Sequence, residues 1–151
     1  MTLARKPRAT DDKPCNLPWS IGEDQVGIET TWGTVQPMDP VPGVRTVGEL
    51  ELIEMLEDGA LPVDSRVADS RSGVTLPGAV HLPHDEVLAR RDELDPSRVS
   101  ILFCNGPQCP QSPEALQALV DADYPHEALA YYRGGLHDWI SLGYPTAPTQ
   151  E

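Results

Sequence analysis

The stretch Ser100–Leu119, SILFCNGPQCPQSPEALQAL, decides the fold of this chain. It opens with an apolar run, Ile101–Phe103, which has the length and composition of a buried strand. It closes with the start of a helix, because Ser112–Pro113 supplies a good N-cap residue followed by a proline for the first helical position. The segment between them contains Cys104 and Cys109. The stretch therefore predicts a strand, a cysteine-bearing loop and a helix in direct succession.

Cys104 lies at the carboxyl end of the predicted strand and ahead of the predicted helix, where α/β folds place their ligands. The N-terminus of a helix favours negative charge, and the same field lowers the pKa of a thiol. We therefore expect Cys104 to be a nucleophile with a pKa below that of a free thiol, and Cys109 to be less reactive. The alternative is that Cys104 is a buried small residue that ends the strand. The rest of the expected active-site loop is Asn105, Gly106, Pro107, Gln108, Cys109, Pro110 and Gln111.

The composition indicates a folded domain that carries irregular, proline-rich segments. The chain has 151 residues, of which 39% are hydrophobic and 16 are prolines. Its formal net charge of -13 argues against nucleic acid or an anionic membrane as a partner, because both need a basic surface. No apolar stretch follows the basic residues at 5–8, so we expect no secretory signal. An odd count of 3 cysteines argues against a disulfide framework, and we expect a cytoplasmic protein with reduced thiols.

Three segments are expected along the chain. Residues 1–18 are polar and lack periodicity, which predicts a disordered tail that carries Cys15. Residues 19–43 contain several prolines together with Trp19 and Trp32, and we expect a proline-rich extended arm packed on the domain. Residues 44–148 are expected to form the domain itself.

Strand and helix patterns alternate within residues 44–148. Strands are expected within 61–66, 76–83, 101–103 and 128–132, and helices at 85–94, 113–122 and 136–142. A further helix is expected after Thr46, which can form a capping box with Glu49. This alternation predicts an α/β fold in which helices cover both faces of a parallel sheet.

Four blocks of sequence together resemble the rhodanese domain, the thiosulfate sulfurtransferase family, and its small single-domain subgroup in particular. The blocks are VDSR at Val63–Arg66, TLPGAVHLP at Thr75–Pro83, ILFCNG at Ile101–Gly106 and YRGGLHDWISLGYP at Tyr132–Pro145. The resemblance implies a five-stranded parallel sheet flanked by helices on both faces. It also implies that Cys104 is the catalytic residue.

In such enzymes the cysteine thiolate attacks the outer sulfur of a donor such as thiosulfate and becomes a persulfide. A thiol or cyanide acceptor then removes that sulfur. The resemblance thus implies a small anionic sulfur donor, a thiol or cyanide acceptor that in cells can be a protein thiol, and no cofactor or metal. The physiological donor, the acceptor and the oligomeric state stay open.

The loop departs from the family pattern at its end. Family loops usually carry a basic residue five positions after the cysteine, and this chain has Cys109 there. Binding of an anionic donor then needs charge from elsewhere, and Arg66, Arg71 and Arg133 flank the matching blocks. For Arg66 the alternative is a structural ion pair with Asp64.

Other functions compete with sulfur transfer. One is a rhodanese-fold binding, regulatory or thiol-redox module with little turnover, in which Cys109 resolves an oxidised Cys104 as a disulfide. A cysteine phosphatase or arsenate reductase would need an arginine to close the loop, and residues 109–111 provide none.

Overall fold

The computed structural model describes residues 2–5, 19–22, 25–28, 35–71 and 73–150, with side chains described from residue 35 onward. Its α-helices are α1 (Glu49–Glu57), α2 (Gln111–Asp121) and α3 (Gly135–Ser141). Short 3-10 helices are η1 (Ala68–Ser70), η2 (Arg91–Glu93) and η3 (His126–Ala128). The strands are β1 (Thr2–Arg5), β2 (Trp19–Gly22), β3 (Gln25–Ile28), β4 (Arg45–Val47), β5 (Leu61–Asp64), β6 (Val74–Thr75), β7 (Val80–His81), β8 (Ser100–Phe103), β9 (Leu129–Tyr132) and β10 (Ala147–Pro148).

Five strands form a parallel sheet in the order β4-β9-β8-β5-β7, which confirms the predicted fold class. The register pairs Phe103 with Asp64 of β5 and with Tyr132 of β9, so these three strands end at the same edge. The segments that follow them therefore meet at that edge, as in other open α/β sheets.

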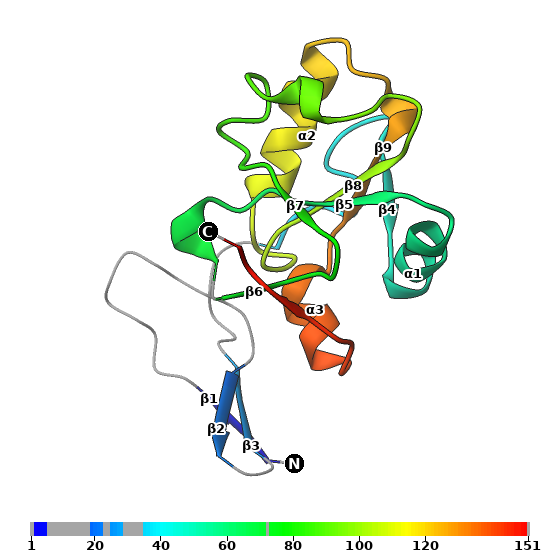
Figure 1. Cartoon of the computed structure of the whole chain (residues 1–151). Coiled ribbons are helices and arrows are strands. Elements are labelled where there is room, and N and C mark those ends of the chain that lie inside the picture. Colours follow the sequence, from blue (N-terminus) through cyan, green and yellow to red (C-terminus); the bar gives the residue numbers. More distant parts are fainter. Residues whose placement is uncertain (1, 6–18, 23–24, 29–34, 72, 151) are drawn as a thin grey trace.

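Helices cover both faces of this sheet, as Figure 1 shows with α2 on one side and α1 and α3 on the other. Leu102 of β8 belongs to the hydrophobic cluster that contains Leu116 of α2. Its neighbour Phe103 belongs to a second cluster with Leu52 of α1 and Trp139 of α3. Successive residues of a strand point to opposite faces, which is why every residue of β8 is buried.

Several predicted elements begin or end elsewhere. Thr46 lies in β4, a strand that the sequence analysis did not identify, and its hydroxyl donates to the carbonyl of Met38 instead of capping a helix. The helix α1 begins after Gly48, whose N–H donates to the Glu51 carboxylate. The predicted helix at 85–94 is wrong, because only turns and the short η2 occupy that segment.

The N-terminal part of the chain contains a small sheet of its own. The strands β1, β3 and β2 pair in that order, so a strand occupies residues 2–5 of the expected tail. Cys15 of the expected tail and Trp32 of the expected arm lie outside the described residues. Residues 35–43 do contact the domain, since Val41 is buried in the cluster beside α2 and the Gln36 N–H donates to the carbonyl of Pro107.

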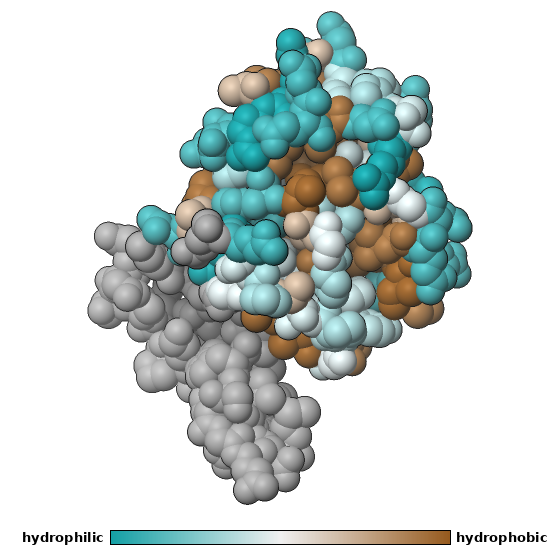
Figure 2. All heavy atoms as spheres, viewed as in Figure 1, coloured by the Kyte–Doolittle hydropathy of each residue, from teal (hydrophilic) through white to brown (hydrophobic). Residues whose placement is uncertain are grey.

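The outer surface is largely polar, in keeping with the acidic composition. Figure 2 shows hydrophilic residues over much of one face, with hydrophobic residues exposed between them. Leu50 and Leu142 are among the large apolar side chains that are exposed. No helix in the described part of the chain is long and apolar enough to cross a membrane.

Candidate active site

The cysteine loop leaves the carboxyl end of β8, at the sheet edge described above. Cys104 directly follows the strand and is only 1% exposed. Two backbone hydrogen bonds join the start of α3 to the loop. The N–H of Leu136 donates to the Cys104 carbonyl at 3.0 Å, and the N–H of His137 donates to the Asn105 carbonyl at 2.7 Å. The backbone of the loop is therefore anchored to a neighbouring element at the point where its cysteine sits.

This close approach requires a glycine at the first position of α3. Gly135 has a positive φ of 61°, a conformation that L side chains rarely adopt. A Cβ atom at Gly135 would overlap the carbonyl oxygen of Cys104 and would lie 2.8 Å from the amide nitrogen of Gly106. The second glycine of the YRGGLHDW block thus lets the loop and α3 touch through their backbones.

The two loop thiols lie against each other. The Cys104 thiol donates to the carbonyl oxygen of Cys109 at 3.4 Å, and the two thiol groups are near enough to shift each other's pKa. Both side chains are buried and neither forms a disulfide. The loop therefore brings together two cysteines that the sequence separates by four residues.

The start of α2 directs hydrogen-bond donors at both sulfur atoms. The N–H and the hydroxyl of Ser112 stabilise a thiolate on Cys104. The N–H groups of Gln111 and Asn105 do the same for Cys109. Of these donors, Gln111 and Ser112 lie in the first turn of α2, where free N–H groups are suited to stabilise an anion.

Burial and the interaction between the two cysteines shift the pKa values of their thiols in opposite directions. Burial raises the pKa of Cys104 well above its usual value, and the contact with Cys109 raises it further. The pKa of Cys109 is lowered, chiefly by the interaction of its side chain with that of Cys104. The expectation of a lowered Cys104 pKa is therefore wrong, because burial raises it.

Ser112 has a role that the sequence analysis did not identify. It was expected to cap α2, but the helix begins at Gln111 with Pro110 before it, so Ser112 lies inside the first turn. Its hydroxyl is 2.5 Å from that of Ser65, which itself donates to the carbonyl of Phe103. Ser112 can therefore donate to Ser65 while Cys104 is neutral, and to Cys104 once that thiol ionises.

Arg66 is a buried residue that contacts the cysteine loop through Asn105. Its guanidinium group is fully buried and forms a bidentate pair with Asp64, at 2.8 and 2.7 Å. It also donates to the side-chain oxygen of Asn105 at 2.8 Å, and the Asn105 amide donates to the carbonyl of Ser70 at 2.9 Å. Arg66 thus fixes the first residue after Cys104, and its positive charge contributes to the lowered pKa of Cys109.

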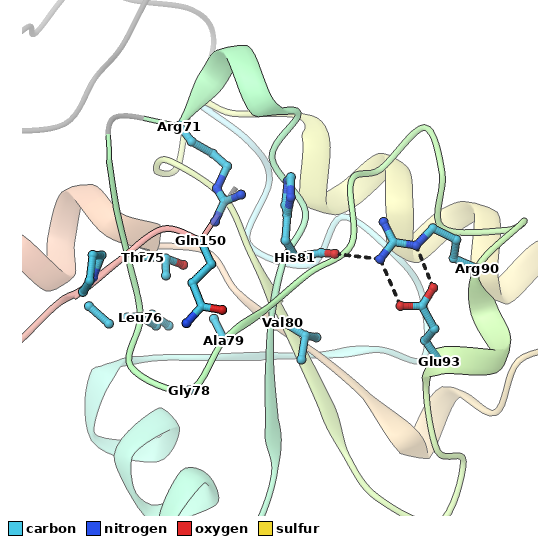
Figure 3. Close-up of a pocket in the computed structure, with 12 residues that line it drawn as sticks. Arg71, Thr75, Leu76, Gly78, Ala79, Val80, His81, Arg90, Glu93 and Gln150 are labelled. Atoms are coloured by element: carbon cyan, nitrogen blue, oxygen red, sulfur yellow. Dashed lines mark hydrogen bonds and ion pairs between the residues drawn. The ribbon is translucent and has the colours of Figure 1, made fainter.

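Arg71 faces a different space. Its Nε lies 3.5 Å from Asp64 and has no hydrogen-bond partner among the described residues. Figure 3 shows Arg71 reaching into a cavity, with His81 and the Arg90–Glu93 ion pair also on its wall. The cavity has a volume of about 450 Å³, and its wall includes none of the described loop residues 104–111.

Arg133 connects the arm to the domain. Its Nε and one terminal nitrogen donate to the carbonyl of Gln36 at 3.0 and 2.7 Å. Because the N–H of Gln36 donates to Pro107, this arginine and the cysteine loop are held to the same short segment. The structure therefore places Arg66 and Arg133 around the loop, and Arg71 on a separate cavity.

The remaining predicted loop residues lie between the thiols and the surface. Pro107 and Gln108 are half-buried and Pro110 is exposed. The Gln111 side chain accepts from the N–H of Val67 at 3.1 Å and so ties the loop end to the segment after β5. Among the described residues, no group of three or more His, Cys, Asp or Glu side chains could hold a metal ion.

Comparison with known proteins places this site in a family. Solved structures with the same fold include a protein from Lactobacillus plantarum, with 16% identity, a TM-score of 0.60, and coverage of 69% of this chain and 88% of that one. The Alr3790 protein from Anabaena has 25% identity and a TM-score of 0.57, and the match covers 67% of this chain and 79% of that one. A thiosulfate sulfurtransferase from Pseudomonas aeruginosa has 25% identity and a TM-score of 0.58, and the match covers 71% of this chain but 21% of that longer one.

Comparison with curated proteins gave no significant match. The model of the rhodanese-like domain matches residues 49–142, which include the cysteine loop and both glycines at the start of α3. That range is well over half of the chain, and the resemblance seen in the sequence is confirmed: the chain belongs to the rhodanese-like domain family.

Proposed function

We propose that this protein is a sulfurtransferase that moves a sulfane sulfur from a thiosulfate-like donor to a thiophilic acceptor, through a persulfide on Cys104. The observation that carries the proposal is the position of Cys104, at the end of β8 with donors from the start of α2 around its sulfur. The family and the similarity to a thiosulfate sulfurtransferase support the same reaction.

The thiol pair supplies the nucleophile for the first step. Because the pKa of Cys109 is lowered, its thiolate can act as the base that takes the proton of Cys104. The Cys104 sulfur then attacks the outer sulfur of thiosulfate, the sulfur–sulfur bond of the donor breaks, and sulfite leaves with the bonding electrons. The products are sulfite, a Cys104 persulfide and a neutral Cys109 thiol.

The donors at the loop stabilise the charge that this step creates. A persulfide at Cys104 carries its negative charge on the outer sulfur, and the N–H and hydroxyl of Ser112 stabilise negative charge on the Cys104 sulfur to which that outer sulfur is bonded. An acceptor thiolate or cyanide then attacks the outer sulfur, and Cys104 leaves as a thiolate that regains its proton. Ser112 is thus proposed to assist both steps.

Donor binding relies on the charge beneath the loop. Arg66 and Arg71 both contact Asp64, and the positive charge of Arg66 acts on the loop, where it lowers the pKa of Cys109. The nearer of them, Arg66, is fully engaged in hydrogen bonds and acts through its field, not by direct contact. We therefore expect weak affinity for a doubly charged donor. A reducing compartment such as the cytoplasm fits the proposal, because both thiols must stay reduced.

Replacement of Cys104 tests the proposal. Cys104→Ser is expected to abolish thiosulfate:cyanide sulfur transfer and sulfite release, with an unchanged circular dichroism spectrum. Cys15→Ser, at the cysteine outside the family match, is the matched control and should retain both. Wild-type protein that releases no sulfite, or a Cys104→Ser variant that still does, would overturn the proposal. A wild-type protein without sulfite release would favour the binding or regulatory alternative.

A further inference from the structure

The position of Cys109 raises the question of what happens to a persulfide on Cys104 when no external acceptor is present. The Cys104 thiol donates to the backbone carbonyl of Cys109 at 3.4 Å, in a loop that is anchored at both ends. Cys104 is 1% exposed and Cys109 is 2% exposed, so each sulfur is nearly enclosed by protein. The thiol nearest to a Cys104 persulfide therefore belongs to the protein itself.

We propose a second activity, which rests on the proposed function: the protein reduces the sulfane sulfur to hydrosulfide and forms a Cys104–Cys109 disulfide. In this step the Cys109 sulfur attacks the inner sulfur of the persulfide. The bond between the inner and outer sulfur atoms breaks, the outer sulfur leaves as hydrosulfide with the thiol proton of Cys109, and a new bond joins the two cysteine sulfur atoms.

The electrons of this step balance without a further reactant. The two cysteine thiols are oxidised to the disulfide, and the sulfur taken from thiosulfate is reduced to hydrosulfide. A dithiol reductant then restores both thiols for the next turnover. The substrate class is thus a small anionic sulfane-sulfur donor together with a dithiol.

Three features of the loop favour the internal attack. The attacking sulfur belongs to the residue whose carbonyl oxygen lies 3.4 Å from the Cys104 sulfur, and such proximity gives an intramolecular reaction a large advantage over a second molecule. The N–H groups of Gln111 and Asn105 lower the pKa of Cys109 and so increase its thiolate fraction. Hydrosulfide is also a good leaving group, because hydrogen sulfide is more acidic than an alkyl thiol.

A single-turnover experiment without an acceptor tests the proposal. Fully reduced protein is mixed with thiosulfate, and sulfite and hydrosulfide are both measured per chain. Wild-type protein is expected to release about equal amounts of the two. Cys109→Ser and Cys109→Ala are expected to release sulfite, more slowly because the base is lost, but no hydrosulfide. The ratio of the two products does not depend on the rate of the first step.

Mass spectrometry identifies the protein product. Trypsin cleavage after Arg98 and Arg133 gives one peptide, 99–133, that carries both loop cysteines. In wild-type protein this peptide is expected to lose two hydrogens, whereas in either Cys109 variant it gains one sulfur atom. Dithiothreitol should then restore the wild-type peptide and permit a second release of hydrosulfide.

The outcomes separate the two proposals. No sulfite from wild-type protein would overturn the proposed function. Sulfite without hydrosulfide, together with a stable persulfide in wild-type protein, would overturn the disulfide step alone. Hydrosulfide release that persists in both Cys109 variants would also overturn it, because Cys109 would then not be the resolving thiol.

Discussion

Gly135 is the position where a single methyl group should disturb the thiol loop most. In Gly135→Ala the new Cβ would meet the backbone of residues 104–106 and not a side chain that can rotate away. The nearest permitted arrangement requires the loop or α3 to shift by several tenths of an ångström. Such a shift moves Cys104, whose carbonyl accepts the N–H of Leu136.

Gly143 provides a matched control for this change. It also has a positive φ, of 81°, but no atom lies within 4 Å of the Cβ that an alanine would add. Both variants should lose about 1–2 kcal/mol because a non-glycine residue must adopt the left-handed conformation. Gly135→Ala should lose about 1–3 kcal/mol more, the usual effect of overpacking.

Urea unfolding and sulfite release measure the two consequences. We expect Gly135→Ala to unfold at lower urea than Gly143→Ala, and to release sulfite at least about tenfold more slowly under conditions where both are folded, since small misplacements of reacting groups reduce rates steeply. If the two variants have equal stability and equal sulfite rates, the contact between α3 and the loop does not position the thiols.

Two further predictions concern ionisation. In a Cys15→Ser background, Cys104→Ala removes the side-chain interaction that chiefly lowers the pKa of Cys109. We expect that pKa to rise, as measured by alkylation rates against pH. An unchanged pKa would assign the charge stabilisation to other groups. Burial raises the pKa of Tyr131, so its contribution to stability is complete below the unfolded pKa of about 10 and is lost as the pH rises above it. Tyr131→Phe removes a hydroxyl that has no hydrogen-bond partner among the described residues, so it should keep or raise the stability at neutral pH. In urea unfolding, the variant should also lose less stability at alkaline pH than the wild-type protein. An equally steep loss in the variant would assign the alkaline loss of stability to other groups.

The fold could be predicted because its core strands have a recognisable apolar pattern in the sequence. The run Ile101–Phe103 is apolar throughout, since β8 lies in the middle of the sheet and is covered on both faces. The strand β4 could not be found in this way. It has 3 residues, stands at the edge of the sheet, and exposes Arg45, so it carries no apolar pattern.

The candidate site was only partly predictable for a related reason. Cys104 could be singled out because its place after a strand and before a helix is a local property of the chain. The pKa directions of the two thiols depend instead on a contact across the loop, which no spacing rule specifies. The role of Ser112 depends in the same way on Ser65, which is 47 positions away and is brought near by the pairing of β5 with β8.

The presence of Cys109, where the family resemblance implies a basic residue, affects what the loop can do with a bound sulfur. A cation at that position would stabilise the persulfide anion and hold it until an external acceptor arrives. A thiol gives weaker stabilisation, and in addition it can accept a proton from Cys104 and attack the persulfide that forms there. The buried guanidinium group of Arg66 donates to the Asn105 side chain, and its positive charge contributes to the lowered pKa of Cys109. The departure from the family pattern is therefore consistent with a loop that releases its sulfur internally, and a basic residue at position 109 should convert it into one that stores the persulfide.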